Sequence, residues 1–425
     1  MLYNTNKILK GEAFLKGDKS ISHRLLMMAS LIEDDSVLYN LSDASDVITT
    51  IDCLKACGVN IQSKSKISPS APIKIKGGNL QNPANTLNCQ NSGSTARMLI
   101  GLLAGQGINA SFSGDDSLLK RPMLRIIEPL IDMGVDIQSN NNFLPLTINL
   151  KNIKPINYCI KTNSAQVKSA LMFAALGSKE YSYIAYNEYT RNHSEKLLQF
   201  LNCNLEIGEK IKIKKTIFRK GIKVHVPGDI SSAAFLIAAS IIIPGSKIKL
   251  RNILYNSTRM GFVEILKKMG AKIKISEVNN DSFESACTIE SEFSPNLMPI
   301  KINKDNIIQL IDEIPILCAV ATQVSGRTII EDAGELRLKE SDRLHAICEN
   351  LKSMGADVSE REDGLSIVGK KKLYNTRINS FGDHRIAMSF EILNFLVSGA
   401  YCGSFSNIIK VSFPDFYNTI DCLSK

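Results

Sequence analysis

Long apolar stretches, each opened by a short polar turn, recur along the 425-residue chain. In six of them small and apolar residues follow a polar head at helical spacing. They are KGDKSISHRLLMMASLI from residue 16, NSGSTARMLIGLLAG from 91, NSAQVKSALMFAALGS from 163, PGDISSAAFLIAAS from 227, IDEIPILCAVATQVSG from 311 and GDHRIAMSFEILNFLVSG from 382. Their spacing of roughly 65 to 85 residues indicates a repeated structural unit.

A second amphipathic segment follows alternating, strand-like sequence in these units. The segments are TIDCLKACGVNI, RIIEPLIDMGVDI, EKLLQFLNCNLEI, VEILKKMGAKI and AICENLKSMGADV. Four close on Gly and one on Asn202, the residues that tolerate the left-handed conformation at a helix C-terminus. The pattern predicts six units of two helices and several strands.

The fold class predicted from this repeat is α/β, with two lobes of three units each. The chain is too long for one hydrophobic core, since single cores stop growing near 250 to 300 residues. One lobe is expected to span residues 18–228, and the other to combine residues 1–17 with 229–425. Small residues inside the apolar helices predict that these helices are closely buried.

Composition narrows the class of protein. Hydrophobic residues make up 44% of the chain, but no apolar run is long enough for a membrane span. The first 20 residues lack the apolar core of a signal peptide. Ten scattered cysteines without paired metal-ligand spacing indicate buried, reduced thiols. We therefore expect a cytoplasmic protein with no membrane partner. No apolar helix stands out as an unexplained surface, so a monomer is expected.

The net charge of +9 is compatible with nucleic acid or with small acidic substrates. Much of it is lysine alternating with apolar residues, as in KIKIKKTIFRK, which is typical of the exposed face of strands. The chain contains no tryptophan and no basic patch interleaved with aromatic residues for stacking bases. We expect no nucleic-acid partner.

The first polar head, KGDKSISHR, resembles a phosphate-binding loop in its lysine and serine, but a P-loop would require Gly in place of Asp18 and Ala13. An ordinary helix capped by Asp18 or Ser20 is the simpler alternative. Six such heads converging in two groups of three would instead concentrate positive helix ends on a cleft between the lobes.

Basic residues gather at these heads and in nearby turns. They are Lys19, Arg24, Arg97, Lys120, Arg121, Arg191, Lys339, Arg343 and Arg385. Guanidinium groups suit carboxylates and phosphates because they bind two oxygens at fixed geometry. Asp312 and Glu340 lie among these cations, where a carboxylate can move protons or hold hydroxyls; a structural ion pair is the alternative.

The ordered set GDKSISHR, NSGSTAR, SLLKRPM, SAQVKSAL, GDISSAAF, DEIP, ELRLKESDR and GDHRIAM resembles the 5-enolpyruvylshikimate-3-phosphate (EPSP) synthase family over nearly the whole chain. The resemblance implies a pair of inside-out α/β barrels. It also implies 3-phosphoshikimate 1-carboxyvinyltransferase activity, which joins shikimate 3-phosphate to phosphoenolpyruvate and releases phosphate, in the shikimate pathway. It implies no metal and no cofactor.

The same resemblance assigns roles to individual residues. Asp312, Glu340 and Lys19 would be catalytic, and Asp312 with Lys339 would bind the shikimate hydroxyls. Phosphoenolpyruvate would be held by Gly93, Arg121, Arg343 and Arg385, in a pocket that the inhibitor glyphosate shares. Shikimate 3-phosphate would be bound by Lys19, Ser20, Arg24, Ser164, Ala165, Gln166 and Arg191.

The alternative function is that of the related UDP-N-acetylglucosamine enolpyruvyl transferases. That family carries a catalytic cysteine in a Gly-Cys-Ala-Ile-Gly-Ala-Arg loop, whereas the corresponding region here, GDDSLLKRPM, contains none. The departure favours the shikimate substrate.

Overall fold

The computed structural model describes residues 7–68, 71–149, 152–401 and 403–424. The chain divides into two compact units. One unit consists of Lys16–Val226 with Asp281–Glu284, and is called here the 16–226 unit. The other consists of Met1–Leu15, Pro227–Asn280 and Ser285–Lys425, and is called the 227–425 unit.

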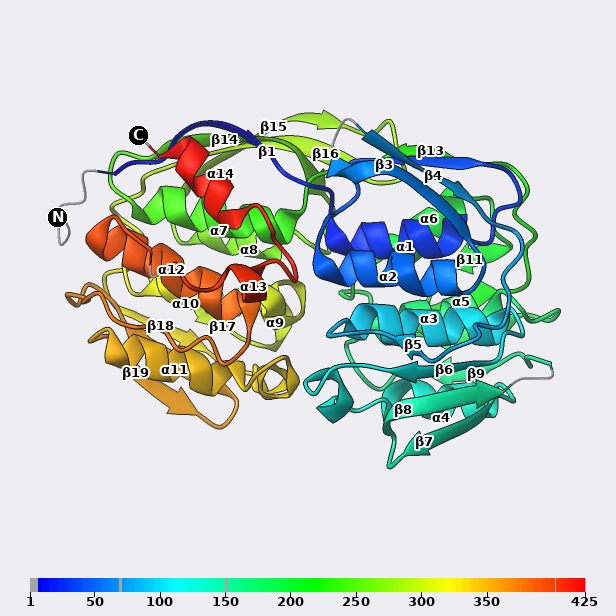
Figure 1. The fold of residues 1–425 in the computed structure, drawn as a ribbon. Coiled ribbons are helices and arrows are strands. Elements are labelled where there is room, and N and C mark those ends of the chain that lie inside the picture. Colours follow the sequence, from blue (N-terminus) through cyan, green and yellow to red (C-terminus); the bar gives the residue numbers. More distant parts are fainter. Residues whose placement is uncertain (1–6, 69–70, 150–151, 402, 425) are drawn as a thin grey trace. The chain divides into compact units, whose positions relative to one another are not determined.

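Helices and short strands alternate through the 16–226 unit (Figure 1). Its helices are α1 (Lys19–Ala29), α2 (Ser45–Ala56), α3 (Gly93–Gly105), the 3-10 helix η1 (Leu118–Lys120), α4 (Leu124–Asp132), α5 (Ala165–Ala175) and α6 (His193–Phe200). Its strands are β2 (Ser36–Tyr39), β3 (Asn60–Ser68), β4 (Ala71–Lys76), β5 (Leu87–Asn88), β6 (Ala110–Ser113), β7 (Asp136–Asn140), β8 (Phe143–Asn149), β9 (Asn157–Cys159), β10 (Ser182–Ala185), β11 (Leu205–Ile207), β12 (Lys210–Ile213) and β13 (Lys223–His225).

The 227–425 unit has the same alternation up to its last helices. Its helices are α7 (Ile230–Ile242), α8 (Gly261–Lys268), α9 (Lys304–Leu310), η2 (Ile311–Glu313), α10 (Ile314–Ala321), η3 (Gly334–Leu338), α11 (Arg343–Ser353), α12 (His384–Ser398), α13 (Ser406–Ile409) and α14 (Phe416–Leu423). Its strands are β1 (Lys10–Phe14), β14 (Lys247–Tyr255), β15 (Lys272–Asn279), β16 (Ser285–Glu292), β17 (Lys301–Ile302), β18 (Arg327–Ile330), β19 (Asp357–Arg361) and β20 (Gly364–Val368).

Five four-stranded sheets in the described residues share one topology. In each, an edge strand pairs in parallel with its neighbour, and the next two strands pair antiparallel. The orders are β13-β2-β4-β3, β5-β6-β8-β7 and β9-β10-β12-β11 in the 16–226 unit, and β1-β14-β16-β15 and β17-β18-β20-β19 in the 227–425 unit. The recurrence explains why the same polar–apolar pattern returns along the sequence.

Two of the edge strands are exchanged along the chain. Strand β1 precedes α1 in sequence, yet it pairs with β14, with Lys10 opposite Lys247. Strand β13 precedes α7, yet it pairs with β2, with Lys223 opposite Val37. Each unit therefore completes its first sheet with a strand from a distant part of the sequence.

The second helix of each sheet-forming repeat ends as the sequence predicts. Gly58, Gly134, Gly270 and Gly355 have φ of 86°, 90°, 89° and 83°, and Asn202 has φ of 52°. These left-handed conformations are unfavourable for most side chains. The C-terminal signal in these segments is therefore confirmed, including the Asn substitute.

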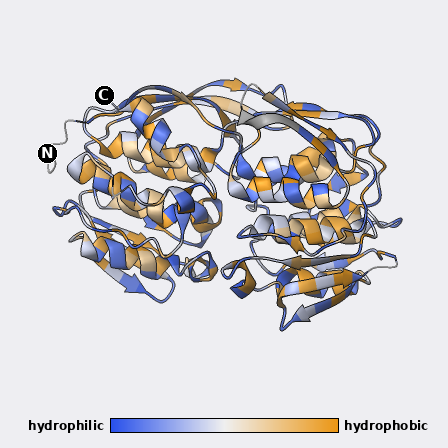
Figure 2. Cartoon of the chain, in the orientation of Figure 1, coloured by the Kyte–Doolittle hydropathy of each residue, from blue (hydrophilic) through white to orange (hydrophobic). Residues whose placement is uncertain are grey.

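The first helices of the repeats are closely buried, as their small residues predict. All residues of α7 are buried. In the 16–226 unit α3 and α5 touch at their backbones: a Cβ at Gly101 would lie 2.2 Å from the carbonyl oxygen of Ala170, and one at Gly105 would lie 2.6 Å from that of Phe173. Figure 2 shows apolar residues concentrated on helices such as α7, where this close burial requires them.

The sixth repeat differs from the prediction that every unit carries strands. Helix α12 is followed by α13 and α14, and no four-stranded sheet is assigned to this repeat within the described residues. The aromatic ring of Phe416 packs edge-on against Phe235 of α7, with ring centres 6.3 Å apart. In this segment a buried aromatic residue is therefore carried by a helix and not by a strand.

Residues 281–284, in the loop between β15 and β16, pack with the 16–226 unit and not with their sequence neighbours. The buried Glu284 carboxylate lies 2.6 Å from His193 Nδ1 and accepts from Lys196 Nζ at 3.3 Å. Phe283 lies beside Phe200, with ring centres 5.8 Å apart. The boundary predicted from the sequence assigns this loop to the other lobe, because nothing local in a hairpin loop reveals a distant partner.

Candidate active site

Side chains cap the polar heads of five of the six repeated helices. Asp18, Ser92, Ser164, Asp229 and Asp383 each accept from a backbone N–H in the first turn of the helix that follows. Helix α10 differs, since η2 precedes it and it has no side-chain cap. Capping satisfies only some of the free amides at a helix start, and the positive end of the helix dipole remains.

Arg24 is the centre of the polar contacts at the start of α1. Its buried guanidinium donates from Nε to Ser194 Oγ at 2.8 Å, from Nη2 to Ser169 Oγ at 2.7 Å, and from Nη1 to the carbonyl of Ser20 at 2.8 Å. Arg191 Nη1 lies 3.5 Å from Ser20 Oγ. The structure therefore brings Ser20, Arg24 and Arg191 together, as the resemblance implies.

Lys19 and the residues at the start of α5 are the next predicted residues of the 16–226 unit. Lys19 Nζ donates to Asp46 Oδ2 at 2.9 Å, a partner that the sequence did not indicate. Ser164 caps α5 through a contact of 3.4 Å with the backbone N of Val167, and the half-buried Ala165 begins the helix. Ser164 therefore has a local structural role in addition to its predicted one.

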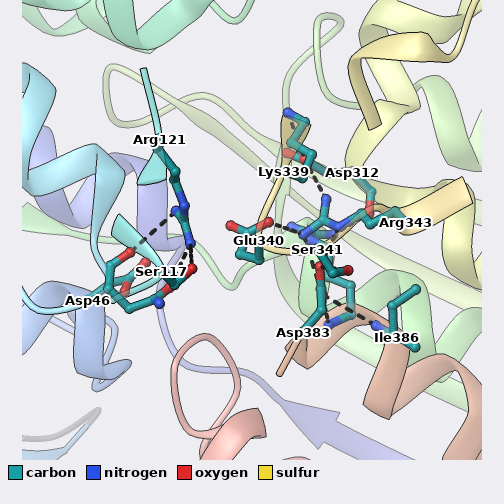
Figure 3. A network of polar contacts seen from close by, with 12 residues as sticks. Asp46, Ser117, Arg121, Asp312, Lys339, Glu340, Ser341, Arg343, Asp383 and Ile386 are labelled. Atoms are coloured by element: carbon teal, nitrogen blue, oxygen red, sulfur yellow. Dashed lines mark hydrogen bonds and ion pairs between the residues drawn. The ribbon is translucent and has the colours of Figure 1, made fainter. Parts of the chain in front are cut away.

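The start of α3 carries a second group of predicted residues. Arg121, at the end of η1, donates from Nη2 to Asn91 Oδ1 at 3.0 Å. The same nitrogen donates to Ser117 Oγ at 3.1 Å (Figure 3). A Cβ at Gly93 would lie 3.5 Å from Arg121 Nη1. Gly93 and Arg121 are therefore neighbours, whereas the adjacent Lys120 is exposed.

Arg97 links this group to Gln166. Its Nη1 donates to Gln166 Oε1 at 2.9 Å, and the Gln166 amide donates to Ser94 Oγ at 2.9 Å. Arg97 also lies next to Gly93, since a Cβ there would be 2.7 Å from Arg97 Nη1. A basic residue noted in the sequence without a role thus connects two residues that the resemblance places in the site.

Arg343 organises the predicted residues of the 227–425 unit (Figure 3). Its guanidinium is 1% exposed and donates from Nε to Asp383 Oδ2 at 2.7 Å and from Nη2 to Glu340 Oε2 at 2.5 Å. Asp312 Oδ1 lies 3.5 Å from Arg343 Nη1 and 3.6 Å from Lys339 Nζ. The two predicted carboxylates and two of the predicted cations therefore form one cluster.

Burial alone would disfavour the charged form of Arg343. The carboxylates of Asp383, Glu340 and Asp312 outweigh that effect and raise the pKa of Arg343 above its ordinary value. Arg343 consequently stays a cation at every physiological pH.

Arg385 at the start of α12 is held by a second set of contacts. Its Nη1 donates to the carbonyl oxygen of Asp312 at 2.7 Å and to Glu313 Oε1 at 3.4 Å. Glu313 also accepts from Ser231 Oγ at 2.5 Å, and Ser231 Oγ accepts from Arg259 Nη2 at 3.0 Å. His384, beside Arg385, is buried.

Sequence reasoning missed several polar residues that hold the predicted ones. Asp383 is fully buried against Arg343, Glu313 contacts Arg385, and the buried Lys168 and Glu195 form an ion pair one residue from Ser169 and Ser194. A signal was present for Lys168, because a lysine inside an otherwise small and apolar helix needs a buried partner. For the others only the three-dimensional contacts distinguish them from ordinary caps and surface charges.

No helix among the described residues combines the length and apolar character that a membrane crossing requires. Within the same part of the chain, no three or more His, Cys, Asp or Glu side chains are grouped so that they could hold a metal ion.

Repeated α/β units with cations gathered at the starts of buried helices define an α/β protein suited to anionic ligands. A model of the EPSP synthase (3-phosphoshikimate 1-carboxyvinyltransferase) family matches residues 3–420. The chain belongs to this family.

Individual relatives agree with the family match. Proteins named 3-phosphoshikimate 1-carboxyvinyltransferase from Persephonella marina and Streptococcus thermophilus are each 39% identical to this chain, over 422 and 420 residues. The matches cover 97% and 98% of this chain, and 96% and 97% of those proteins. A solved structure of EPSP synthase from Acinetobacter baumannii is 33% identical, with a TM-score of 0.86, and the match covers 99% of this chain and 97% of that one.

Membership confirms the family and the inside-out α/β barrel fold predicted from the ordered motifs. It also confirms the predicted transferase activity of the shikimate pathway over the UDP-N-acetylglucosamine alternative.

Proposed function

We propose that the residues gathered at α1, α5 and the start of α6 bind shikimate 3-phosphate in the enolpyruvyl transfer reaction. The residues are Lys19, Ser20, Arg24, Ser164, Ala165, Gln166 and Arg191. The contacts of Arg24 support this, because its donors are already oriented by Ser194, Ser169 and Ser20. A guanidinium fixed in this way recognises a phosphate without losing side-chain freedom on binding.

Phosphoenolpyruvate is held by Gly93, Arg121, Arg343 and Arg385 in this proposal. Its phosphate and carboxylate require several cations, and arginine offers paired donors to each. Gly93 leaves the start of α3 open to close approach by a ligand because it has no Cβ. Asp312 and Lys339 bind the hydroxyl groups of shikimate 3-phosphate.

The reaction proceeds by addition and then elimination. Asp312 accepts the proton of the 5-hydroxyl as its oxygen forms a bond with C2 of phosphoenolpyruvate, and Glu340 delivers a proton to C3. In the tetrahedral intermediate C3 is a methyl group. The C2–O bond to phosphate then breaks, and Glu340 takes one methyl proton back, which leaves the enol ether and free phosphate. Lys19 assists these proton transfers.

The cluster around Arg343 is the observation that carries this mechanism. Asp312 and Glu340 contact the same buried arginine, at 3.5 and 2.5 Å, and both remain partly exposed. A fully buried structural pair would be inaccessible to a substrate, whereas these two carboxylates are partly exposed. Arg343 orients both carboxylates through these contacts.

Substitution of Glu340 by Gln tests the proton-transfer role. The variant should fold and bind both substrates, while kcat falls about 10²-fold or more, the usual scale for a lost proton-transfer group. The half-exposed Glu349 on α11 is a suitable control, because Glu349→Gln removes a carboxylate from the same unit. Normal turnover in the Glu340 variant would assign Glu340 to a purely structural pair with Arg343.

Phosphate release distinguishes the acceptors. We expect release with phosphoenolpyruvate and shikimate 3-phosphate, and none with phosphoenolpyruvate and UDP-N-acetylglucosamine. We further propose that the chain acts as a cytoplasmic monomer without a nucleic-acid partner, which light scattering of the purified protein at assay concentration would test for the oligomeric state.

A further inference from the structure

Lys168 on α5 is a charged side chain almost completely enclosed by the 16–226 unit. Its Nζ lies 2.5 Å from Glu195 Oε1 and donates to Thr190 Oγ1 at 2.9 Å, and the ammonium group stands 4.5 Å from the centre of the Tyr186 ring. The Lys168 and Glu195 side chains are 1% and 3% exposed. Three groups therefore hold one ammonium ion in place.

Stability alone does not explain this arrangement. Burial lowers the pKa of Lys168 even though Glu195 opposes that effect, so desolvation of the ammonium is not fully compensated. Apolar side chains of similar volume commonly replace a buried ion pair with no loss of stability. The charged pair therefore points to a geometric role.

The neighbours of this pair connect it to the substrate-binding residues. Ser169 directly follows Lys168 in the sequence, and Ser194 directly precedes Glu195. The hydroxyl oxygens of the two serines are 2.7 Å apart. Both hydroxyls accept from Arg24. An ion pair and a hydroxyl pair thus bridge α5 and α6 side by side, and the hydroxyl pair orients Arg24.

The same bridge reaches Arg191. Thr190, which receives the hydrogen bond from Lys168, is the residue directly before Arg191. Thr190 Oγ1 also donates to the carbonyl of Asn187 at 2.6 Å, so its hydroxyl joins the loop before α6 to α5. Any movement of Lys168 would be transmitted to the backbone that carries Arg191.

We propose that Lys168 and Glu195 are positioning residues that hold Arg24 and Arg191 in place for the phosphate of shikimate 3-phosphate. The inference rests on the proposed function, which assigns that substrate to Arg24 and Arg191. It adds that loss of the bridge affects this substrate and spares phosphoenolpyruvate, because no contact of Lys168 or Glu195 described above leads to Gly93 or Arg121.

Thr190→Val is the mildest test, because valine matches threonine in shape and lacks only the hydroxyl. We expect KM for shikimate 3-phosphate to rise about tenfold, equivalent to about 1.4 kcal/mol. KM for phosphoenolpyruvate at saturating shikimate 3-phosphate should change less than about threefold, as should kcat. Thr190→Ser, which keeps the hydroxyl acceptor, should restore KM to near the wild-type value.

The double variant Lys168→Met with Glu195→Gln removes both charges of the pair, so neither is left buried without its partner. It should show the same selective rise in KM for shikimate 3-phosphate, of about tenfold or more. Circular dichroism and thermal melting verify that each variant is folded. If the double variant does not fold, the comparison of Thr190→Val with Thr190→Ser decides alone.

Arg24→Ala separates failure of this inference from failure of the proposed function. Unchanged KM values in the folded Thr190 and Lys168–Glu195 variants would overturn the positioning role, as would equal changes for both substrates. If Arg24→Ala raised KM for shikimate 3-phosphate in the same assays, only the positioning role would be lost. A normal KM in Arg24→Ala would overturn the substrate assignment itself.

Discussion

The buried carboxylate of Asp383 tests how the cluster around Arg343 is held together. Asp383 Oδ2 accepts from Arg343 Nε at 2.7 Å, and Oδ1 accepts from the backbone N of Arg385 at 2.8 Å, at the start of α12. Asp383→Asn removes the negative charge but keeps an oxygen for the helix cap, since Asn and Asp cap helices about equally well. The substitution therefore separates the ion pair from the cap.

The expected loss follows from what Arg343 retains. Removing one partner of a buried ion pair costs about 3–5 kcal/mol, because the other charge stays buried. Arg343 keeps Glu340 at 2.5 Å and Asp312 at 3.5 Å, so we expect the lower end, about 3 kcal/mol of unfolding free energy. Asp383→Ala also loses the cap and should cost about 1 kcal/mol more.

Asp342 provides the matched control. It caps α11 by accepting from the backbone N of His345 at 3.1 Å, and it pairs with Arg337 at 2.8 Å, but its side chain is 41% exposed. Asp342→Asn therefore makes the same chemical change at a solvent-exposed ion pair, and such a pair contributes about 0–1 kcal/mol.

Urea unfolding followed by far-UV circular dichroism measures both variants, since the chain has no tryptophan for fluorescence. The two units require a fit that allows two transitions. With a slope of about 3 kcal/mol/M, the Asp383→Asn midpoint should fall by about 1 M. A loss below about 1 kcal/mol, or one equal to that of Asp342→Asn, would refute the argument that burial makes this pair strong.

Three further predictions concern individual residues. Arg121→Ala should lower kcat/KM for phosphoenolpyruvate, with a loss of at least about 2 kcal/mol of transition-state stabilisation. Lys120 is its exposed neighbour, and in Lys120→Ala the corresponding loss should stay within about 0.5 kcal/mol. In Gly93→Ala the new Cβ would lie 2.7 Å from Arg97 Nη1, so Arg97 must move. Inhibition titrations should then show resistance to glyphosate, with about 1–3 kcal/mol of discrimination and a higher KM for phosphoenolpyruvate; equal inhibition of both proteins would remove Gly93 from the pocket. Burial, with Lys19 and Arg24 nearby, lowers the pKa of His23 well below its ordinary value. Stability is therefore complete above about pH 6.5 and falls below it, by about 1.4 kcal/mol at pH 5.5. His23→Asn should lack this loss in urea titrations at pH 7.5 and 5.5, and an identical pH dependence in both proteins would show that His23 is not the group responsible.

Local signals in the sequence determined the ends of the repeated helices. Asp18 and Ser92 accept from backbone amides three residues ahead, so the residues that make a cap are adjacent in the sequence. Gly58 and Asn202 end their helices through their own backbone conformations, which depend on residue type and not on distant partners. The ordered motifs can also be read directly from the sequence, and they were sufficient to identify the family.

The pairing of distant segments was decided only by the tertiary structure. The sequence does not show that β1 joins β14, that Asp46 pairs with Lys19, or that Asp383 is buried against Arg343. Each contact joins segments far apart in the chain, and its strength depends on how completely the surrounding elements exclude water. A carboxylate has the same chemical character in any sequence, but only the packed fold determines whether it is a surface charge, a helix cap or the buried partner of an arginine.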